Sequence, residues 1–165
     1  AITPMCALRP LVEHNTADSC AFEMNDRYYK YPGKRQGKVA AAIWPWKCKD
    51  ALLRYNDVAD TKLNQDGMAY DADSGDGTVY EYNYSAYNEG GAMMFCLGEA
   101  VHSTYRHNVS YRDLGGVLSP SGNPDALVDG TTFYMEPGVP LRRKRNHGKM
   151  KLVNNTVVPA DSKED

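Results

Sequence analysis

Residues 71–84, DADSGDGTVYEYNY, decide how the middle of the chain is interpreted. The acidic first half is typical of a calcium loop, in which alternating oxygen ligands converge on a tight turn. The candidate ligands are Asp71, Asp73 and Asp76. Counted from Asp71, however, the fifth, sixth and twelfth positions of an EF-hand loop fall on Gly75, Asp76 and Tyr82, which are the wrong residue types. The first half is therefore predicted to be a glycine-containing turn without a structural metal.

The second half of this stretch alternates in the manner of a β-strand, and the pattern continues to residue 87. In a continuous strand, Tyr80, Tyr82 and Tyr84 would share one face, because successive side chains point to opposite sides. Such a tyrosine face either covers the core of the domain itself or forms an interface with another molecule. The residues alone leave both interpretations open.

The flanking sequence predicts an α+β fold in a single domain. Helices are expected over residues 16–31 and 50–59, because apolar side chains recur there at helical spacing after a capping residue. Short apolar runs at 37–46 and 92–97 predict buried strands, and Asp129-Gly130 predicts a hairpin. The expected arrangement is short N-terminal helices followed by an antiparallel sheet. No repeat is apparent in this interpretation.

Length and composition are those of one soluble domain. The chain has 165 residues, 42% of them hydrophobic and 24% charged, and no apolar run is long enough to span a membrane. The expected division is an N-terminal arm at 1–15 that contains two prolines, a globular part at 16–136, and a basic and polar extension at 137–165. The N-terminus lacks the pattern of a signal peptide.

Cysteines and glycosylation patterns point to an extracellular or particle-surface protein. The four cysteines permit two disulfides, and a Cys6–Cys20 bridge is the favoured pairing in an oxidising compartment. The alternative is a reduced protein with four buried thiols. Three N-x-S/T patterns make Asn83, Asn108 and Asn154 candidate glycosylation sites. The candidate disulfide residues are Cys6, Cys20, Cys48 and Cys96.

No residue pattern in the sequence indicates a catalytic site or a cofactor-binding site. Cys96, His102 and His107 are close in sequence, but their spacing does not place two histidines on one face of a helix or strand, which argues against zinc. Cys96 as a catalytic nucleophile is disfavoured by its apolar neighbours in AMMFCL. The chain has no G-x-S-x-G motif and no glycine-rich phosphate loop. No catalytic residue and no cofactor is therefore predicted.

A basic block occupies residues 142–151. Its six cationic side chains contrast with 13 basic and 21 acidic residues in the remainder of the chain. The block is expected to contact an acidic surface on a neighbouring copy or subunit, and a processing site or a solvated charge run are alternatives. Nucleic acid is a further possible partner but is not favoured, because no aromatic residue stands in the block to stack on a base. The interaction candidates are Arg142, Arg143, Lys144 and Arg145.

Taken together, these patterns favour a non-enzymatic structural or interaction subunit of a larger assembly, such as a virion, a filament or a multi-subunit complex. A secreted effector, toxin or glycoprotein domain stapled by disulfides is the first alternative. A small metal-dependent hydrolase is the second.

Overall fold

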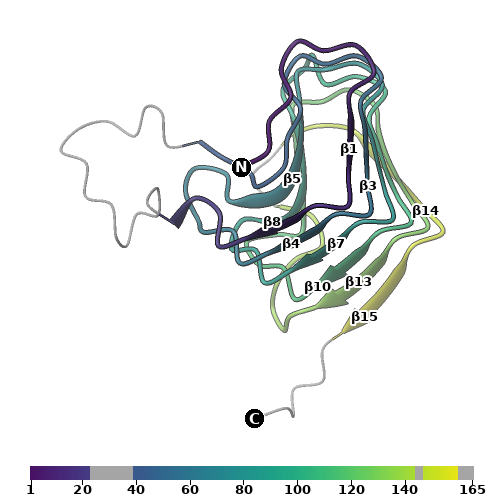
Figure 1. Ribbon diagram of the computed structural model, residues 1–165. Coiled ribbons are helices and arrows are strands. Elements are labelled where there is room, and N and C mark those ends of the chain that lie inside the picture. The colour runs from purple at the N-terminus through teal and green to yellow at the C-terminus, as the bar shows by residue number, and fades with distance from the viewer. Residues whose placement is uncertain (23–38, 144–146, 160–165) are drawn as a thin grey trace.

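The computed structural model describes residues 1–22, 39–143 and 147–159, and it is a parallel β-solenoid of six coils (Figure 1). Each coil crosses three walls in turn, so that segments about 25 residues apart in sequence lie side by side. The pairing between the named strands is parallel throughout the described residues. The expected α+β fold with an antiparallel sheet is therefore wrong.

Three parallel sheets form the walls. Sheet 1 contains β5 (Met68–Asp73), β8 (Gly91–Cys96) and β11 (Leu118–Ser121). Sheet 2 contains β1 (Leu11–Glu13), β3 (Leu52–Arg54), β6 (Val79–Glu81), β9 (Thr104–Arg106), β12 (Ala126–Asp129) and β14 (Met150–Val153). Sheet 3 contains β2 (Thr16–Asp18), β4 (Asp57–Ala59), β7 (Tyr84–Ala86), β10 (Val109–Tyr111), β13 (Thr132–Met135) and β15 (Thr156–Pro159).

The corner between sheets 2 and 3 is built from two residues in each coil. The first adopts a left-handed backbone with φ of 52–56°, which turns the chain sharply between two three-residue strands; these residues are His14, Tyr55, Tyr82, His107, Gly130 and Asn154. The second is usually asparagine, and its side chain bonds to the next coil. The Asn56 and Asn83 backbone N–H groups donate to the side-chain oxygens of Asn83 and Asn108 at 3.0 and 2.8 Å. This asparagine ladder offsets the cost of about 1–2 kcal/mol for each left-handed residue that is not glycine.

The ladder spans all six coils, with one substitution. The Asn15 N–H donates to Asn56 Oδ1 at 3.1 Å, and the Thr131 N–H donates to Asn155 Oδ1 at 2.9 Å. At the fifth coil Thr131 replaces asparagine, and its hydroxyl accepts from the Asn108 N–H at 3.3 Å. The corner is therefore a continuous polar column inside the fold.

The interior is filled by side chains that stack from coil to coil. Tyr70, Tyr80 and Tyr105 are fully buried, and their ring centroids lie 5.3–6.5 Å apart. The Tyr70 hydroxyl donates to the carbonyls of Asn56 and Tyr84, and the Tyr80 hydroxyl donates to those of Ile43 and Asp71. These bonds satisfy the buried phenol groups of Tyr70 and Tyr80, whereas the Tyr105 hydroxyl has no partner among the described residues.

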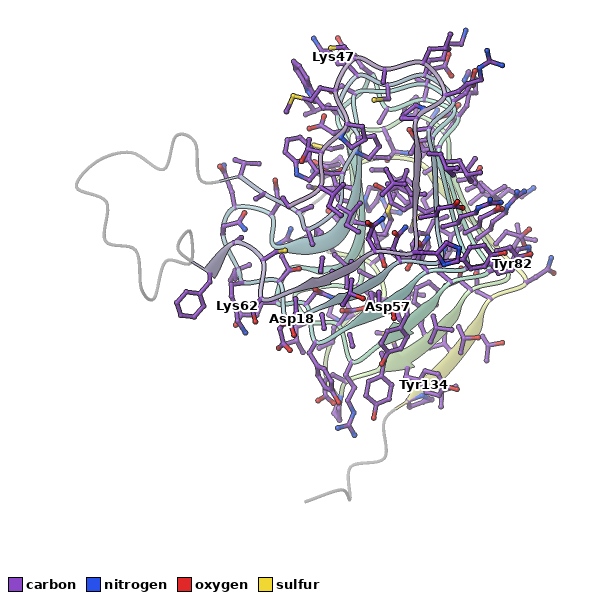
Figure 2. All side chains as sticks on the ribbon, viewed as in Figure 1. Asp18, Lys47, Asp57, Lys62, Tyr82 and Tyr134 are labelled. Atoms are coloured by element: carbon purple, nitrogen blue, oxygen red, sulfur yellow. The ribbon has the colours of Figure 1, made fainter. Side chains whose placement is uncertain are left out.

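On the outside of the same corner, rings and charges are stacked in register. His14, Tyr55, Tyr82 and His107 form an aromatic column with centroid separations of 5.2, 5.5 and 5.4 Å. Tyr82 is labelled at this corner in Figure 2. The residues just before these rings alternate in charge from coil to coil, in the order Glu13, Arg54, Glu81, Arg106, Asp129. The closest ion pairs are Arg54–Glu13 at 2.7 Å and Arg106–Glu81 at 2.6 Å.

The sixth coil leaves inward-facing positions open. Val128 and Phe133 are fully buried in the fifth coil, whereas the residues paired with them, Leu152 and Val157, are 47% and 48% exposed. A cavity of about 320 Å³ lies beside Val157, lined also by Met135, Val139 and Leu141. The apolar interior therefore reaches the surface at this end of the solenoid.

The helices expected from sequence are wrong, because residues with a left-handed backbone interrupt the segments in which they were expected. The expected helix at 50–59 is β3, a turn at Tyr55-Asn56, and β4. The expected helix at 16–31 begins with β2, and its residues from 23 onward lie outside the described residues. The expected N-terminal arm is the first coil, whose residues Ile2, Met5 and Leu8 pair with the second coil. In the described part of the chain, we find no helix long and apolar enough to cross a membrane.

Candidate active site on the outer face of sheet 1

An acidic cluster lies on the outer face of sheet 1, and strand alternation places it there. In β5, Tyr70 and Ala72 point into the core and pair with Met93 and Phe95 of β8. Asp71 and Asp73 therefore point outward, beside Met94 and Cys96. A small apolar cluster also sits on this face; it comprises Ala41, Met68 and Met94, with Trp44 and Cys96 packed against them.

Asp71 is a buried carboxyl group without a hydrogen-bond partner for one of its oxygens. The residue is 3% exposed, and Oδ1 has no partner among the described residues. Burial raises the pKa of Asp71 well above its usual range, and the nearby charges of Asp73 and Asp66 raise the pKa further. These surroundings favour the protonated, neutral form of Asp71.

Asp66 lies in the loop that enters β5 and is only partly buried. Its backbone N–H donates to Asn64 Oδ1 at 2.8 Å, and the loop passes so close to Gly90 that a Cβ there would overlap the Asp66 carbonyl oxygen. Burial raises the pKa of Asp66 to about 6; the charge of Arg143 lowers this pKa and that of Asp73 raises it. Asp66 thus exchanges its proton near neutral pH.

Asp73, at the end of β5, is also partly buried. Burial raises its pKa, whereas a 2.7 Å hydrogen bond from the Ser74 hydroxyl and the charge of Lys47 lower it. Lys47 marks the upper end of the sheet 1 wall in Figure 2. Asp73 therefore has partners that favour its ionised form, which Asp71 lacks.

Asp66 and Asp73 are near enough for the charge of Asp73 to raise the pKa of Asp66, and the two carboxyl groups have different surroundings. A pKa of about 6 lets Asp66 donate a proton near neutral pH, and Asp73 has a hydroxyl and a cation that support a negative charge. Two carboxyl groups of this kind are the requirement for acid-assisted cleavage of a glycosidic bond. Asp71 is too deeply buried to reach a substrate and instead adds to the electrostatics of the pair.

The structure separates the three weak calcium-ligand candidates, and the turn expected to begin at Asp71 is wrong. Asp71 and Asp73 belong to a strand and not to a turn, and Asp76 lies at the next corner, where its carboxylate is 2.8 Å from His102 Nδ1. His107 stacks on Tyr82 at a different corner, so Cys96, His102 and His107 do not converge. Of the histidines and acids considered from sequence, only Asp71 and Asp73 meet Cys96.

The expected tyrosine face does not exist. Tyr80 is fully buried, Tyr82 is the left-handed corner residue and 50% exposed, and Tyr84 begins the next wall and is 39% exposed. The three residues are separated because the chain turns at Tyr82-Asn83. Residues further along sheet 3 do expose tyrosine; Tyr134 projects outward in Figure 2.

The expected disulfide is also wrong, because all four cysteines are free. Cys6 precedes β1 and Cys20 follows β2 in the first coil. The Cys48 thiol donates to the carbonyls of Pro4 and Trp46 at 3.5 and 3.6 Å. The asparagines of two candidate glycosylation sites, Asn83 and Asn108, are buried in the ladder, whereas Asn154 is exposed.

The basic block contributes to the acidic face. Arg142 pairs with Leu118 of β11, and its side chain donates to the Gly148 carbonyl at 2.9 Å. The backbone N–H of Arg143 donates to the Leu118 carbonyl, and its charge acts on Asp66. Lys144 and Arg145 lie outside the described residues.

Comparison with known proteins identifies similar hydrolases. The chain is 40% identical over 165 residues to a lacto-N-biosidase of Bifidobacterium longum subsp. longum, covering 97% of this chain and 10% of that protein. Crystal structures of GH136 lacto-N-biosidase from Eubacterium ramulus, native and selenomethionine forms, superpose with a TM-score of 0.91 and 59% identity. The match covers 96% of this chain and 26% of that one. No family model matches.

This chain is similar to one segment of a lacto-N-biosidase. The segment spans about a quarter of the solved enzyme and a tenth of the curated one. Because the similar proteins are glycoside hydrolases, the expectation of a non-enzymatic structural subunit of a virion, filament or complex is overturned, and so is the expectation that the chain is not an enzyme. No disulfide supports a stapled effector domain either.

Proposed function

We propose that this chain forms the acidic wall of a β-solenoid glycoside hydrolase of the lacto-N-biosidase type. The observation that carries the proposal is the 59% identity to such an enzyme across nearly the whole solenoid, at a TM-score of 0.91. The acidic face supplies chemistry that suits the activity, because Asp66 and Asp73 are partly exposed carboxyl groups with separate environments.

In the proposed reaction, Asp66 is the general acid. Its proton moves to the glycosidic oxygen as the bond from this oxygen to the anomeric carbon breaks, and a pKa of about 6 lets it hold that proton under mildly acidic conditions. Asp73, as a carboxylate, acts on the anomeric carbon directly or through a water that becomes the new hydroxyl. Burial raises the pKa of Asp73, and the Ser74 hydroxyl and the charge of Lys47 oppose this rise and favour the ionised form that the step needs.

The proposal predicts that kcat/KM is highest between the pKa values of the two groups. Loss of the Asp66 proton should end activity above about pH 6, and protonation of Asp73 should end it at lower pH. Burial is the largest cause of the raised pKa of both carboxyl groups.

The test is a segment exchange. This chain replaces the 59%-identical segment of the Eubacterium ramulus enzyme, and release of lacto-N-biose from a p-nitrophenyl glycoside is measured for the chimera and for this chain by itself. We expect activity in the chimera that falls by about 10²–10⁴-fold in Asp66→Asn and Asp73→Asn. The matched control is Asp76→Asn, an aspartate at the neighbouring corner that contacts His102.

An active chimera that is insensitive to both substitutions would contradict the assignment of the carboxylate pair. A chimera that folds, by circular dichroism and thermal unfolding, yet has no activity would contradict the proposed function.

A further inference from the structure

The acidic face contains a group of three side chains, of which only Asp73 is a reacting group in the proposed hydrolysis. Cys96 ends β8 directly beside Asp73 in the parallel register, and one ligand atom from each of Asp71, Asp73 and Cys96 lies within 4.8 Å of the others. All three side chains point away from the core, because they occupy the same alternate positions of two adjacent strands. The sheet therefore holds two carboxylates and a thiol around one point.

Asp71 provides an independent indication that something binds at this point. The residue is only 3% exposed and its carboxylate is aimed into the group, and Oδ1 has no hydrogen-bond partner in the described part of the chain. A buried polar atom without a partner costs about 1–3 kcal/mol, so native structures rarely keep one without a reason. A cation bound between Asp71, Asp73 and Cys96 would supply the missing partner.

The ligand set selects the kind of cation. Calcium and magnesium require more oxygen ligands than the two carboxylates supply, and they do not favour sulfur. One thiolate and two carboxylates, with a fourth position left for water or substrate, suit a four-coordinate ion of the zinc class. Cys96 is partly exposed, so an ion can reach the sulfur from solvent.

We propose that Asp71, Asp73 and Cys96 form a binding site for a thiophilic divalent cation, represented by Zn²⁺, and that its occupancy blocks the hydrolytic site. The blocking rests on the proposed function, because Asp73 would serve both as a metal ligand and as a reacting carboxylate. When the cation binds, the thiol proton of Cys96 and the proton held by Asp71 pass to solvent, and no oxidant or reductant is needed.

Binding is tested on the full chain with Co²⁺ as the spectroscopic probe, under a non-thiol reductant. Titration should produce the near-ultraviolet charge-transfer band of a thiolate–cobalt bond, and Zn²⁺ should abolish the band by competition. We expect Cys96→Ser to eliminate the band and to weaken Zn²⁺ binding by at least about tenfold in calorimetry, and Asp71→Asn to weaken it similarly. The matched control is Cys6→Ser, an exposed thiol on the first coil that should leave the band unchanged.

A second measurement needs no variant and therefore does not depend on how well Cys96→Ser folds. Zn²⁺ should slow alkylation of Cys96 in the unmodified protein by at least about tenfold, as read by peptide mass spectrometry, while Cys6 reacts at its usual rate. Unchanged Cys96 alkylation, or a cobalt band that persists in Cys96→Ser, would overturn the site.

The blocking is tested in the active chimera. Zn²⁺ should inhibit lacto-N-biose release and a chelator should restore it, and Cys96→Ser should raise the inhibitory Zn²⁺ concentration by at least about tenfold relative to its own metal-free rate. Equal inhibition of both proteins would overturn the blocking. A cobalt band in a protein that has no hydrolase activity would support the metal site and refute the proposed function, so the two failures are distinguishable.

Discussion

The corner between sheets 2 and 3 and the outer face of sheet 1 both remove polar side chains from water, but only the corner pairs them fully. At the corner, Asn83 accepts from the backbone and side chain of Asn56 and donates to Leu53 and Asn108. On the outer face, Asp71 keeps an unpaired oxygen and Trp44 an unpaired indole N–H, within the described residues. The corner therefore stabilises the coils, whereas the outer face gives up stability for carboxyl groups with raised pKa values.

The most damaging change at the corner is Asn83→Ala. It removes the acceptor for two N–H groups of Asn56 and the hydrogen bond from Asn83 Nδ2 to the Leu53 carbonyl, all in a buried site. We expect a loss of about 4 kcal/mol in the free energy of unfolding, measured by urea denaturation. The control is Asn154→Gly at the exposed end of the same corner, where the backbone φ of 53° suits glycine and the change should be small. Equal losses in both variants would remove the distinction between a buried ladder and an exposed turn.

The raised pKa of Asp66 on the outer face should make the stability of the protein depend on pH. The pKa of Asp66 is raised from 3.8 to about 6, so the folded state binds more protons than the unfolded state between these values. Stability should therefore fall as pH rises from about 4 to 6, by about 3 kcal/mol for this group. The free energy of unfolding is measured by urea denaturation at a series of pH values. Asp66→Asn should reduce its slope against pH between about 4 and 6. Asp18→Asn, at an exposed position on β2, is the control and should keep the slope.

The effect of the acidic outer face on activity is tested through the charge of Arg143, which acts on Asp66. Because this charge lowers the pKa of Asp66, Arg143→Gln should raise that pKa and move the alkaline limb of the kcat/KM profile upward by about one pH unit. The profile is measured in the active chimera. Arg142→Gln is the control, since the Arg142 side chain bonds to the Gly148 carbonyl. A downward shift in Arg143→Gln would contradict the assignment of Asp66 as the acid.

The smallest effect on the free energy of unfolding is expected in the aromatic column, on the solvent side of the corner. Tyr82 stacks between Tyr55 and His107 and is half exposed, so Tyr82→Ala should cost about 1 kcal/mol in urea denaturation. Tyr84→Ala, with similar exposure on the adjacent wall, serves as the comparison for loss of area alone. If both cost the same, ring stacking adds nothing beyond burial.

The sequence contained the corner motif, although it was not detected as a repeat. His14-Asn15, Tyr55-Asn56, Tyr82-Asn83 and His107-Asn108 are the same two positions in successive coils, but they are 41, 27 and 25 residues apart. A fixed-period search misses such a series, because the first interval includes the long segment between β2 and β3. The Tyr-rich stretch appeared to be one strand because alternation continues across a left-handed residue that belongs to neither strand.

Part of the acidic site was visible from sequence and part was not. Asp71 and Asp73 were singled out by their spacing, which places them on one face of a strand as well as in a loop. Asp66 had no signal, and Cys96 was considered as a metal ligand only with His102 and His107, because both residues approach Asp71 and Asp73 through the close passage of the Asp66 loop at Gly90 and the parallel register of β5 and β8. Those contacts are properties of the coiling and not of any local pattern.

The alternating charges outside the corner also discriminate against misfolding. If one coil were skipped during assembly, Glu13 would lie opposite Glu81 and Arg54 opposite Arg106, so each native ion pair would become a repulsion. Single surface pairs contribute less than about 1 kcal/mol, but such an error would reverse several at once. In a fold whose coils resemble one another, the alternating charges therefore disfavour an alignment that is wrong by one coil.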